Sequence, residues 1–475
     1  MNRYKLLLNG EWHDSNDRLS VIDPATHQPF AEVATVDRGR VRQAIEDGSA
    51  AFHSWKALTA KTRGDYIRTI AAELEKRGDL IAELITRENG KPLAQAKGEV
   101  AMSIDHLLWF AEEGRRAYGR VVPQQADGKR HLVVRQPVGV VGAIAPWNFP
   151  LVLAVRKVAP ALAAGCSVIL KPASATPLSA CEFARCVEAA KLPAGVFQLV
   201  VGPAAEIAGE MLENQKCRKI SFTGSTEVGR SLIKGAAETC TELSLELGGN
   251  APLIVFEDAD FDQAIDGVLV TKFRNNGQSC IAANRIYIQS SIFERFTEQL
   301  TAKIGALGVG SGMDNGVDVG PLIDEKALSS ALSFIDEAVA AGARVLVGGK
   351  RYGEEGNFLV PTLLTDVPED VRCHKEEIFA PIAAMYRFDN EQEIIDKAND
   401  TEFGLAAYAF TTDLNRAFRV SEALEAGTVG INDPIPSTSN CPFGGFKQSG
   451  WGRELGSEGI DAYLETKHIS IAGIG

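Results

Sequence analysis

Apolar residues along this chain alternate between the spacing of strands and the spacing of helices. Short apolar segments such as 138–144 and 167–170 are each followed by a stretch with helical spacing, such as 151–164 and 178–190. The alternation continues with strands at 197–201, 219–222 and 242–247 and helices at 204–212 and 226–237. Strands that alternate with helices predict a parallel sheet covered on both faces, so the sequence predicts an α/β fold.

A second alternating region begins at Pro252 and ends at Val429-Gly430-Ile431-Asn432. Its patterns predict helices at 261–273, 292–307 and 326–341, strands at 285–288 and 383–388, and an apolar segment at 405–410. Nucleotides commonly bind at the carboxyl ends of parallel strands such as those predicted for the first region.

Other patterns precede the first sheet. Asn9-Gly10 between apolar residues predicts a small hairpin over 6–12. Helices are predicted over 37–118, with a break at 89–92. Their predicted N-caps are Asp37, Thr62 and Asp79.

A β-ribbon is predicted over 121–141, with a turn at Asp127-Gly128. Its polar tip indicates an arm that projects from the body, and the tail over 461–471 is predicted to be an edge strand. The uncharged stretch 136–155 approaches the length of a membrane span, but prolines interrupt it. We expect no signal or transit peptide at the start of the chain.

The composition is that of a globular protein with two or three domains: 475 residues, 45% hydrophobic and 23% charged. A net charge of -13 without a basic run argues against nucleic acid and anionic membranes as partners. The eight cysteines are scattered without a CxxC pair, so neither a disulfide framework nor a metal site is predicted. This cysteine usage favours a reducing cytoplasm.

Cys280 ends the polar turn Asn275-Asn276-Gly277-Gln278-Ser279 and is followed by Ile281 and two alanines. A thiol in this position is sterically open and could attack a substrate as its thiolate. The alternative is an inert cysteine that acts as a small buried hydrophobe.

Two further residues could assist such a nucleophile. Glu246 ends an apolar strand between two leucines, where partial desolvation would raise its pKa and suit a general base. Asn148 lies between Pro146 and Pro150, and a rigidly held amide can stabilise an oxyanion. The alternatives are a solvent-facing charge for Glu246 and an ordinary turn residue for Asn148.

Two segments could bind the phosphates of a nucleotide, although no GxGxxG motif occurs. Ser225 follows a strand and could cap a helix whose free N–H groups receive a pyrophosphate. Lys171 places a cation at the carboxyl end of another strand. Each segment could equally have a purely structural role.

Taken together, these motifs resemble those of the aldehyde dehydrogenase superfamily over essentially the whole chain. The matching segments are Pro146-Trp147-Asn148-Phe149-Pro150, Lys171-Pro172-Ala173, Phe222-Thr223-Gly224-Ser225-Thr226, Glu246-Leu247-Gly248-Gly249, Gly277-Gln278-Ser279-Cys280, Glu376-Glu377-Ile378-Phe379-Ala380-Pro381 and Pro442-Phe443-Gly444-Gly445. Each motif is modest alone, but all seven occur in the family's order.

The resemblance implies a catalytic set. Cys280 would attack an aldehyde to form a thiohemiacetal, whose oxyanion Asn148 and the Cys280 N–H would hold. Hydride transfer to the nicotinamide would leave a thioester, which Glu246 would help water to hydrolyse. Lys157 and Glu454 match positions suspected of relaying protons away from the base.

The resemblance also implies a cofactor site. Lys171 would bind the adenosine ribose, Ser225 the pyrophosphate and Glu377 the nicotinamide ribose. Phe379 would lie beside the ring, with Trp147 and Gly224 in the same site. Ser174 stands where many NAD-preferring relatives carry a glutamate that repels a 2′-phosphate. We therefore hypothesise that NADP is accepted and slightly favoured over NAD.

The substrate residues are most similar to those of succinate-semialdehyde dehydrogenases. Arg156 and Arg274 match the arginines that clamp the substrate carboxylate, and Ser437 or Thr438 matches a third contact. The alternative is that both arginines pair with structural acids. The resemblance thus implies NAD(P)-dependent oxidation of succinate semialdehyde to succinate.

The family architecture implies two Rossmann-type domains and a small β oligomerisation element. The predicted cofactor-binding domain covers 1–117 and 142–247, and the catalytic domain covers 248–454. The oligomerisation element covers 118–141 and 455–475, where edge strands favour a homodimer or a homotetramer.

Other functions are also compatible with parts of the sequence. Another short ω-carboxy semialdehyde such as glutarate semialdehyde, or a broad range of aldehydes, would suit the same motifs. A non-catalytic relative is disfavoured because Cys280, Glu246 and Asn148 are all retained. A cysteine hydrolase without cofactor is disfavoured because no histidine partner stands out and nucleotide-binding motifs are present.

Overall fold

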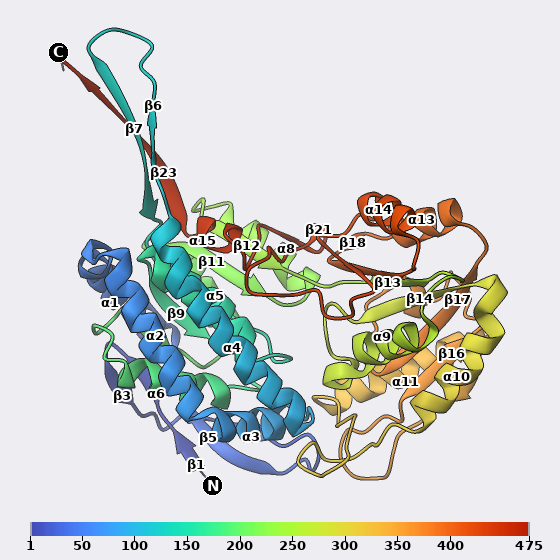
Figure 1. The fold of residues 1–475 in the computed structure, drawn as a ribbon. Coiled ribbons are helices and arrows are strands. Elements are labelled where there is room, and N and C mark those ends of the chain that lie inside the picture. The colour runs from blue at the N-terminus through green and yellow to red at the C-terminus, as the bar shows by residue number, and fades with distance from the viewer. Residues whose placement is uncertain (1, 474–475) are drawn as a thin grey trace.

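The computed structural model describes residues 2–473, and its strands form two large sheets in separate halves of the molecule (Figure 1). Residues 474 and 475, the end of the predicted oligomerisation element, lie outside the described residues, as does Met1. Both sheets are mostly parallel and carry helices on both faces, as the alternating pattern predicts.

The first sheet has six strands, and all but the last run parallel. In spatial order they are β10 (Phe197–Leu199), β9 (Ser167–Lys171), β8 (Val140–Ile144), β11 (Cys217–Thr223), β12 (Glu242–Glu246) and the antiparallel β22 (Gly450–Trp451). The inner strands are fully buried, which explains their continuous apolar runs.

Helices cover this sheet on both faces. On one face α1 (Arg38–Ala57) packs on α7 (Ala204–Glu213), which packs on α8 (Thr226–Ala236). The other helices contact one another in a second layer: α2 (Ala60–Lys76), α3 (Gly78–Asn89), α4 (Leu93–Glu113), α5 (Val152–Ala164) and α6 (Leu178–Ala189).

The second sheet has seven strands. In spatial order they are the antiparallel β15 (Arg344–Val347), then β16 (Thr362–Thr365), β17 (Ile382–Phe388), β14 (Ala283–Gln289), β13 (Ala251–Val255), β19 (Ala406–Phe410) and β20 (Thr428–Ile431). Its helices are α9 (Phe261–Phe273), α10 (Phe293–Gly305), α11 (Glu325–Ala340), α12 (Arg372–Lys375), α13 (Glu391–Asn399) and α14 (Leu414–Ala423).

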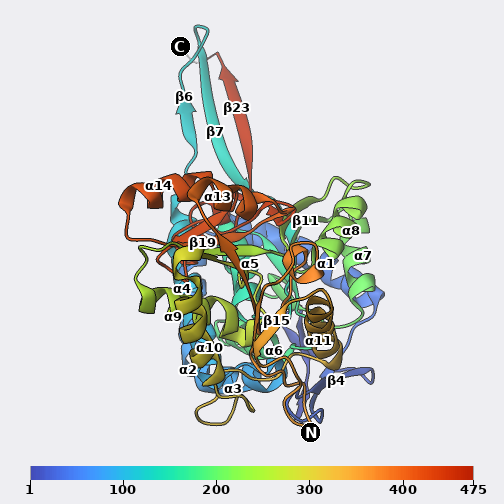
Figure 2. The same cartoon turned by 90° about the vertical axis from the view of Figure 1, so that its right-hand side faces the viewer.

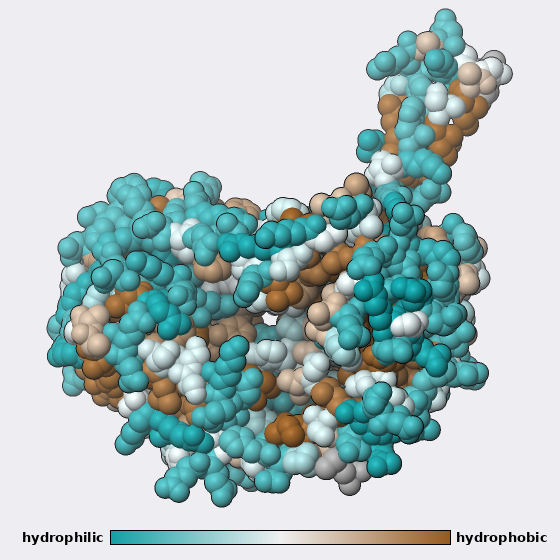
Figure 3. Space-filling model, turned by 180° about the vertical axis from the view of Figure 1, so that it is seen from behind, coloured by the Kyte–Doolittle hydropathy of each residue, from teal (hydrophilic) through white to brown (hydrophobic). Residues whose placement is uncertain are grey.

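A three-stranded arm projects from the body in both ribbon views (Figures 1 and 2). The ribbon β6 (Arg120–Val122) and β7 (Lys129–Pro137) pairs with the tail strand β23 (Leu464–Ala472), which follows the short helix α15 (Glu458–Asp461). The arm and its edge strand confirm the predicted ribbon and tail. Apolar residues gather along the arm, and a hollow lies between the two halves of the body (Figure 3).

Small sheets complete the fold. The predicted hairpin forms from β2 (Leu6–Leu8) and β3 (Glu11–His13) around the left-handed Asn9 and Gly10. A sheet of β1 (Asn2–Tyr4), β5 (Pro29–Ala34) and β4 (Arg18–Ile22) and a pair of β18 (Phe403–Gly404) and β21 (Phe446–Lys447) were not predicted. No helix within residues 2–473 is long and apolar enough to cross a membrane.

Two of the three predicted N-caps are wrong. Asp37 caps α1 as expected, but α2 begins earlier than predicted because the Thr59 hydroxyl accepts the N–H of Thr62 at 3.1 Å. Asp79 lies inside the first turn of α3, where its carboxylate pairs with Lys97 at 2.9 Å.

Candidate active site

The loop that carries Cys280 connects α9 to β14 and is bent by three consecutive left-handed residues. Asn275, Asn276 and Gly277 have φ values of 55°, 58° and 73°. Asparagine and glycine tolerate this conformation better than other residues do. The Asn276 side chain holds the bend, because its oxygen accepts from Gly320 N at 2.7 Å and its nitrogen donates to Pro321 O at 2.9 Å.

Cys280 lies between two cavities and lines both. The larger cavity, of about 250 Å³, is lined by residues from both halves of the molecule: Pro146, Trp147, Asn148, Thr223, Gly224, Ser225, Leu247, Gly248, Cys280, Glu377 and Phe379. The smaller cavity, of about 40 Å³, is lined by Met102, Phe149, Val152, Leu153, Arg156, Arg274, Ser279, Cys280, Ile281, Ile435, Ser437 and Phe443. The sulfur can therefore meet a different molecule on each side.

The Cys280 thiol is partly shielded from solvent. Its removal from bulk water, followed by the negative charge of Glu377, raises the pKa of the thiol to about 12. The guanidinium of Arg156 acts in the opposite direction. The thiol is therefore protonated at neutral pH in the unliganded protein and must lose its proton as it reacts.

Asn148 lies in the loop after β8, and its side chain is buried. Its amide nitrogen donates to the main-chain oxygen of Gln278 at 3.1 Å. Because an amide carries two hydrogens, one remains free to donate to an oxyanion formed at Cys280.

Glu246 ends β12 and is only 3% exposed, so the alternative of a solvent-facing charge is wrong. Neither of its carboxylate oxygens has a hydrogen-bond partner within residues 2–473. Burial, followed by the nearby charge of Glu454, raises its pKa well above the ordinary value. A buried carboxylate with two free oxygens and a raised pKa suits a general base.

Lys157 and Glu454 form a buried ion pair beside this base. The Lys157 ammonium lies 2.5 Å from Glu454 Oε1 and donates to Thr223 Oγ1 at 2.6 Å. The second oxygen, Glu454 Oε2, is buried without a partner in the described part of the chain. The charges of both residues act on the pKa of Glu246, so the structure brings the two predicted relay residues to the base.

The larger cavity also holds most of the predicted cofactor residues. Trp147 and Phe379 meet edge to face, with ring centroids 5.4 Å apart. Glu377 Oε1 accepts from Gly249 N at 3.1 Å. Ser225 caps α8 and leaves the amino end of that helix beside the cavity, where its N–H groups favour an anion.

Lys171 and Ser174 lie at the carboxyl end of β9 and do not line the cavity around Cys280. Burial lowers the pKa of the Lys171 ammonium to about 8, and the group donates to Pro172 O at 3.1 Å. Ser174 is partly exposed in the turn that follows. A cationic donor and a hydroxyl at a strand end suit the hydroxyls or phosphate of a ribose.

The smaller cavity contains two guanidinium groups in largely apolar surroundings. Arg156 is buried, lies 4.8 Å from the Phe443 ring centroid and has an unpartnered Nε. Arg274 lies 5.6 Å from the ring centroid of Phe149. No ion pair involves either arginine within residues 2–473, so the alternative of pairing with structural acids is wrong.

The two candidates for a third substrate contact differ in position. Ser437 lines the smaller cavity, and its hydroxyl accepts from Arg156 Nη2 at 3.0 Å. Thr438 is exposed, and its hydroxyl donates to Asn440 Oδ1 at 2.8 Å. The geometry therefore favours Ser437.

Several residues of the site were not identified from the sequence. Phe149, Met102 and Ile435 line the smaller cavity, although they come from three distant segments. The Asn275 side chain joins the loop of Cys280 to that of Asn148. Only the Asn-Asn-Gly run carried a signal, because it is typical of a left-handed turn.

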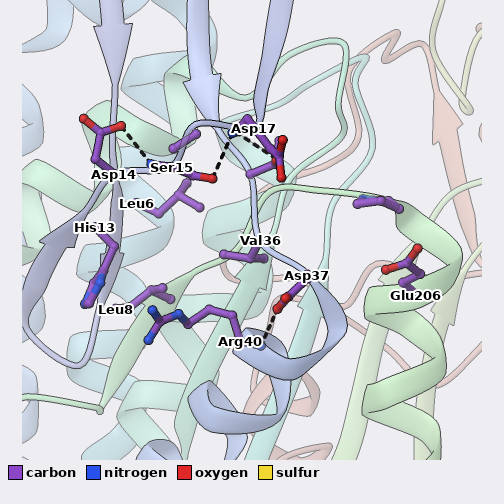
Figure 4. Close-up of a pocket in the computed structure, with 13 residues that line it drawn as sticks. Leu6, Leu8, His13, Asp14, Ser15, Asp17, Val36, Asp37, Arg40 and Glu206 are labelled. Carbon is purple, nitrogen blue, oxygen red and sulfur yellow. Dashed lines mark hydrogen bonds between the residues drawn. The ribbon is translucent and has the colours of Figure 1, made fainter.

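A further cavity, of about 440 Å³, lies between the N-terminal strands and the start of α1 (Figure 4). Its polar groups include His13, Asp17, Arg40 and Glu206, and Asp37 Oδ1 accepts from Arg40 N at 2.8 Å. It shares no lining residue with the two cavities at Cys280.

The whole chain is similar to known aldehyde dehydrogenases in sequence and in fold. A model of the aldehyde dehydrogenase family matches residues 12–469. The NADP(+) succinate-semialdehyde dehydrogenase GabD of Escherichia coli strain K12 is 48% identical over 471 residues, 99% of this chain and 98% of that protein. A glutarate-semialdehyde dehydrogenase of Pseudomonas putida is 47% identical with the same coverage. A crystal structure of a succinate-semialdehyde dehydrogenase from Burkholderia pseudomallei has a TM-score of 0.97 and 44% identity, covering 99% of this chain and 98% of that one.

Proposed function

Since the chain belongs to the aldehyde dehydrogenase family, we propose that it oxidises succinate semialdehyde to succinate and reduces NADP or NAD. The fold is that of the family, and the protein is an NAD(P)-dependent aldehyde dehydrogenase. The observation that carries the proposal is the position of Cys280 between the cavity that most of the predicted cofactor residues line and a small cavity with two guanidinium groups.

The first half of the reaction uses Cys280 and Asn148. The Cys280 sulfur bonds to the aldehyde carbon, and the thiol gives its proton to water. The free hydrogen of the Asn148 amide and the Cys280 N–H hold the oxygen of the resulting thiohemiacetal. NADP or NAD held in the larger cavity would supply the hydride acceptor, and loss of hydride from this carbon would leave a thioester on Cys280.

The second half uses Glu246. Its carboxylate takes a proton from water as the water oxygen bonds to the thioester carbon, and the carbon–sulfur bond then breaks. The Cys280 thiolate takes the proton of the new carboxyl group, and succinate leaves as its anion. The ion pair of Lys157 and Glu454 passes the proton from Glu246 toward solvent, because Glu454 retains an unpartnered oxygen.

Substrate selection rests on charge. Arg156 and Arg274 donate to the distal carboxylate of the semialdehyde, and Ser437 fixes the orientation of Arg156. Charge-assisted bonds of this kind are stronger than neutral ones. Glutarate semialdehyde is the second candidate, because a relative of nearly equal similarity is named for that substrate.

The residues of the larger cavity fit a dinucleotide. The amino end of α8 supplies donors for its phosphates, and the free oxygen of Glu377 supplies an acceptor for a ribose hydroxyl. Phe379 and Trp147 supply apolar surface beside a ring. At the adenosine ribose, Lys171 supplies a positive charge and Ser174 stands in place of a carboxylate. Both features favour the 2′-phosphate of NADP.

Steady-state kinetics with a panel of aldehydes and both cofactors tests this proposal. We expect the highest kcat/KM for succinate semialdehyde, a lower value for glutarate semialdehyde and a much lower one for butanal. Equal values for butanal and the semialdehydes would contradict the proposed substrate class. No reduced cofactor with any aldehyde would contradict the proposed activity itself.

The domain roles and the assembly are also proposals. We assign cofactor binding to 1–117 and 142–247 and catalysis to 248–454, although β22 from the second segment pairs with β12 of the first sheet. We assign assembly to 118–141 and 455–475, because the arm of β6, β7 and β23 exposes Val121, Ile469 and Ile471. Within the described residues the outer edge of β23 is unpaired, which favours pairing with another subunit.

We therefore propose a homodimer or homotetramer, for which light scattering should give two or four times the monomer mass of 51.0 kDa. A monomeric mass would contradict this assembly. We also propose a cytoplasmic location, because the eight cysteines, all within the described residues, are unpaired. Export of the protein in a fractionation experiment would contradict that location.

A further inference from the structure

The main-chain oxygen of Asn148 accepts hydrogen bonds from three side chains. The ammonium of Lys91 donates to it at 2.8 Å, the amide of Asn275 at 2.9 Å and the amide of Asn89 at 3.4 Å. The same Asn275 amide donates to the main-chain oxygen of Gln278 at 2.8 Å. That oxygen also accepts a hydrogen bond from the Asn148 side-chain amide. The loops of Asn148 and Cys280 are therefore closed into one hydrogen-bonded unit.

Lys91 is in turn held by Glu99. Lys91 Nζ lies 2.6 Å from Glu99 Oε2, and both side chains are about 1% exposed. The other oxygen, Glu99 Oε1, accepts from the main-chain nitrogens of Leu151 and Val152 at 2.9 and 3.2 Å. Glu99 thus fixes the start of α5, which follows the Asn148 turn directly.

The geometry points to Lys91 and Glu99 as positioning residues that set the Asn148 amide for the oxyanion. This inference rests on the proposed function, because it assumes that Asn148 stabilises an oxyanion. Neither residue lines a cavity at Cys280, so neither can touch the substrate directly. Lys91 also lies 4.0 Å from the ring centroid of Phe149, so it supports the residue that follows Asn148.

A stability role alone explains this pair less well. Removing two charges from water costs free energy, and apolar replacements of buried pairs are often as stable. By contrast, an oxyanion donor must be held accurately, because a displacement of about 1 Å can cost about 100-fold in rate. The short bonds from Lys91 and Asn275, together with the longer one from Asn89, fix the position and the direction of this carbonyl oxygen.

A double-mutant cycle on the rate of hydride transfer tests the inference. Lys91→Met removes the donor and keeps most of the side-chain volume. We expect it to slow hydride transfer in a single turnover by about 10- to 100-fold, with little change in KM. In an Asn148→Ala background the same substitution should slow the reaction by less than about 2-fold, because the donor that it positions is gone.

Glu88→Gln is the matched control. Glu88 is also buried, and its carboxylate accepts from Leu178 N and Ser179 N at the start of α6, as Glu99 does at α5. Within residues 2–473 it makes no hydrogen bond to Asn148, so Glu88→Gln should leave the hydride-transfer rate within about 2-fold of the wild type. An equal loss in Glu88→Gln and Lys91→Met would overturn the positioning role.

Glu99→Gln keeps the inference testable if Lys91→Met fails to fold. The amide oxygen can still accept the two N–H groups at α5, while Lys91 loses its carboxylate. We expect a rate loss that again disappears in the Asn148→Ala background. If Glu99→Gln slowed hydride transfer by the same factor in the Asn148→Ala background as in the wild type, the inference would be overturned. This holds for whichever aldehyde the enzyme oxidises. An inactive wild type would instead contradict the proposed function.

Discussion

The side-chain amide of Asn148 donates to the main-chain oxygen of Gln278 at 3.1 Å. Asn148 follows β8 of the first sheet, and Gln278 precedes Cys280 in the loop between α9 and β14 of the second half. With the bond from the Asn275 amide to the Asn148 main-chain oxygen, this hydrogen bond joins Asn148 to the loop of the nucleophile. The relative position of the two groups depends on the packing of the two halves against each other.

Gly277 allows the nucleophile loop to pack against the loop of Phe379. A Cβ atom at Gly277 would lie 2.3 Å from the carbonyl carbon of Ala380, and its φ of 73° disfavours a side chain. We expect Gly277→Ala to lower the free energy of unfolding by about 2–4 kcal/mol and to abolish most activity. Thermal denaturation and a standard assay measure both effects.

Gly316 provides the control for that substitution. It has a similar φ of 76°, but a Cβ atom there would meet nothing within 4 Å. Gly316→Ala should therefore lose only about 1–2 kcal/mol and keep its activity. Equal losses in the two variants would show that crowding at Ala380 is unimportant.

Arg274 should discriminate between charged and uncharged aldehydes. We expect Arg274→Ala to raise the KM for succinate semialdehyde by about 10- to 100-fold, because a charge-assisted hydrogen bond is lost. The KM for butanal should change by less than about 2-fold. Arg295→Ala, at an exposed arginine on α10, is the control and should change neither value. A similar rise in KM for both aldehydes would contradict the proposal that Arg274 binds the substrate carboxylate.

Ser174 should set the choice of cofactor. In Ser174→Glu a carboxylate would accept from the ribose hydroxyls of NAD and repel the 2′-phosphate of NADP. We expect the ratio of kcat/KM for NADP to that for NAD to fall by about 10- to 100-fold, which corresponds to about 1.4–2.8 kcal/mol. Ser174→Ala should shift the ratio far less. If the NADP-to-NAD ratio of kcat/KM were unchanged in Ser174→Glu, the 2′-phosphate would not bind beside residue 174.

Cofactor binding should depend on pH through Glu377. Burial raises the pKa of this carboxyl to about 7, and the Gly249 N–H opposes the rise only in part. Below that pH the group is protonated, and above it the carboxylate can accept from a ribose hydroxyl. Its ionised fraction rises about tenfold between pH 6 and pH 8, so the KM for cofactor should fall with rising pH. Glu377→Gln should remove this dependence, and an unchanged pH profile in that variant would rule out Glu377 as its origin.

Most of the fold could be predicted from the sequence, because inner strands and amphipathic helices leave strong periodic patterns. The strands of the first sheet are matched within a few residues, from Val140–Ile144 to Glu242–Glu246. The pattern does not predict β13, because Pro252 near its start argues against a central strand. It also does not predict β15, β16, α13 and α14. The short β22 carries too few residues to show a pattern.

From the sequence, the active site could be predicted only for residues whose type and neighbouring residues indicate a chemical role. Cys280, Glu246 and Asn148 have distinctive neighbours in sequence, and the structure places Cys280 and Asn148 on one cavity with Glu246 close enough to affect the thiol. Lys91 and Glu99 gave no such signal, because their role depends on contacts with residues more than 50 positions away. Tertiary packing alone brings them to the Asn148 turn.

The central claim is that a thioester forms on Cys280 and that Glu246 is needed to hydrolyse it. The most direct test is the intact mass of Glu246→Gln after a single turnover with succinate semialdehyde and NADP, followed by peptide mapping. We predict about one equivalent of reduced cofactor per subunit and a succinyl group that stays on the peptide of Cys280. Continued turnover without an adduct, or an adduct on any other residue, would contradict the account.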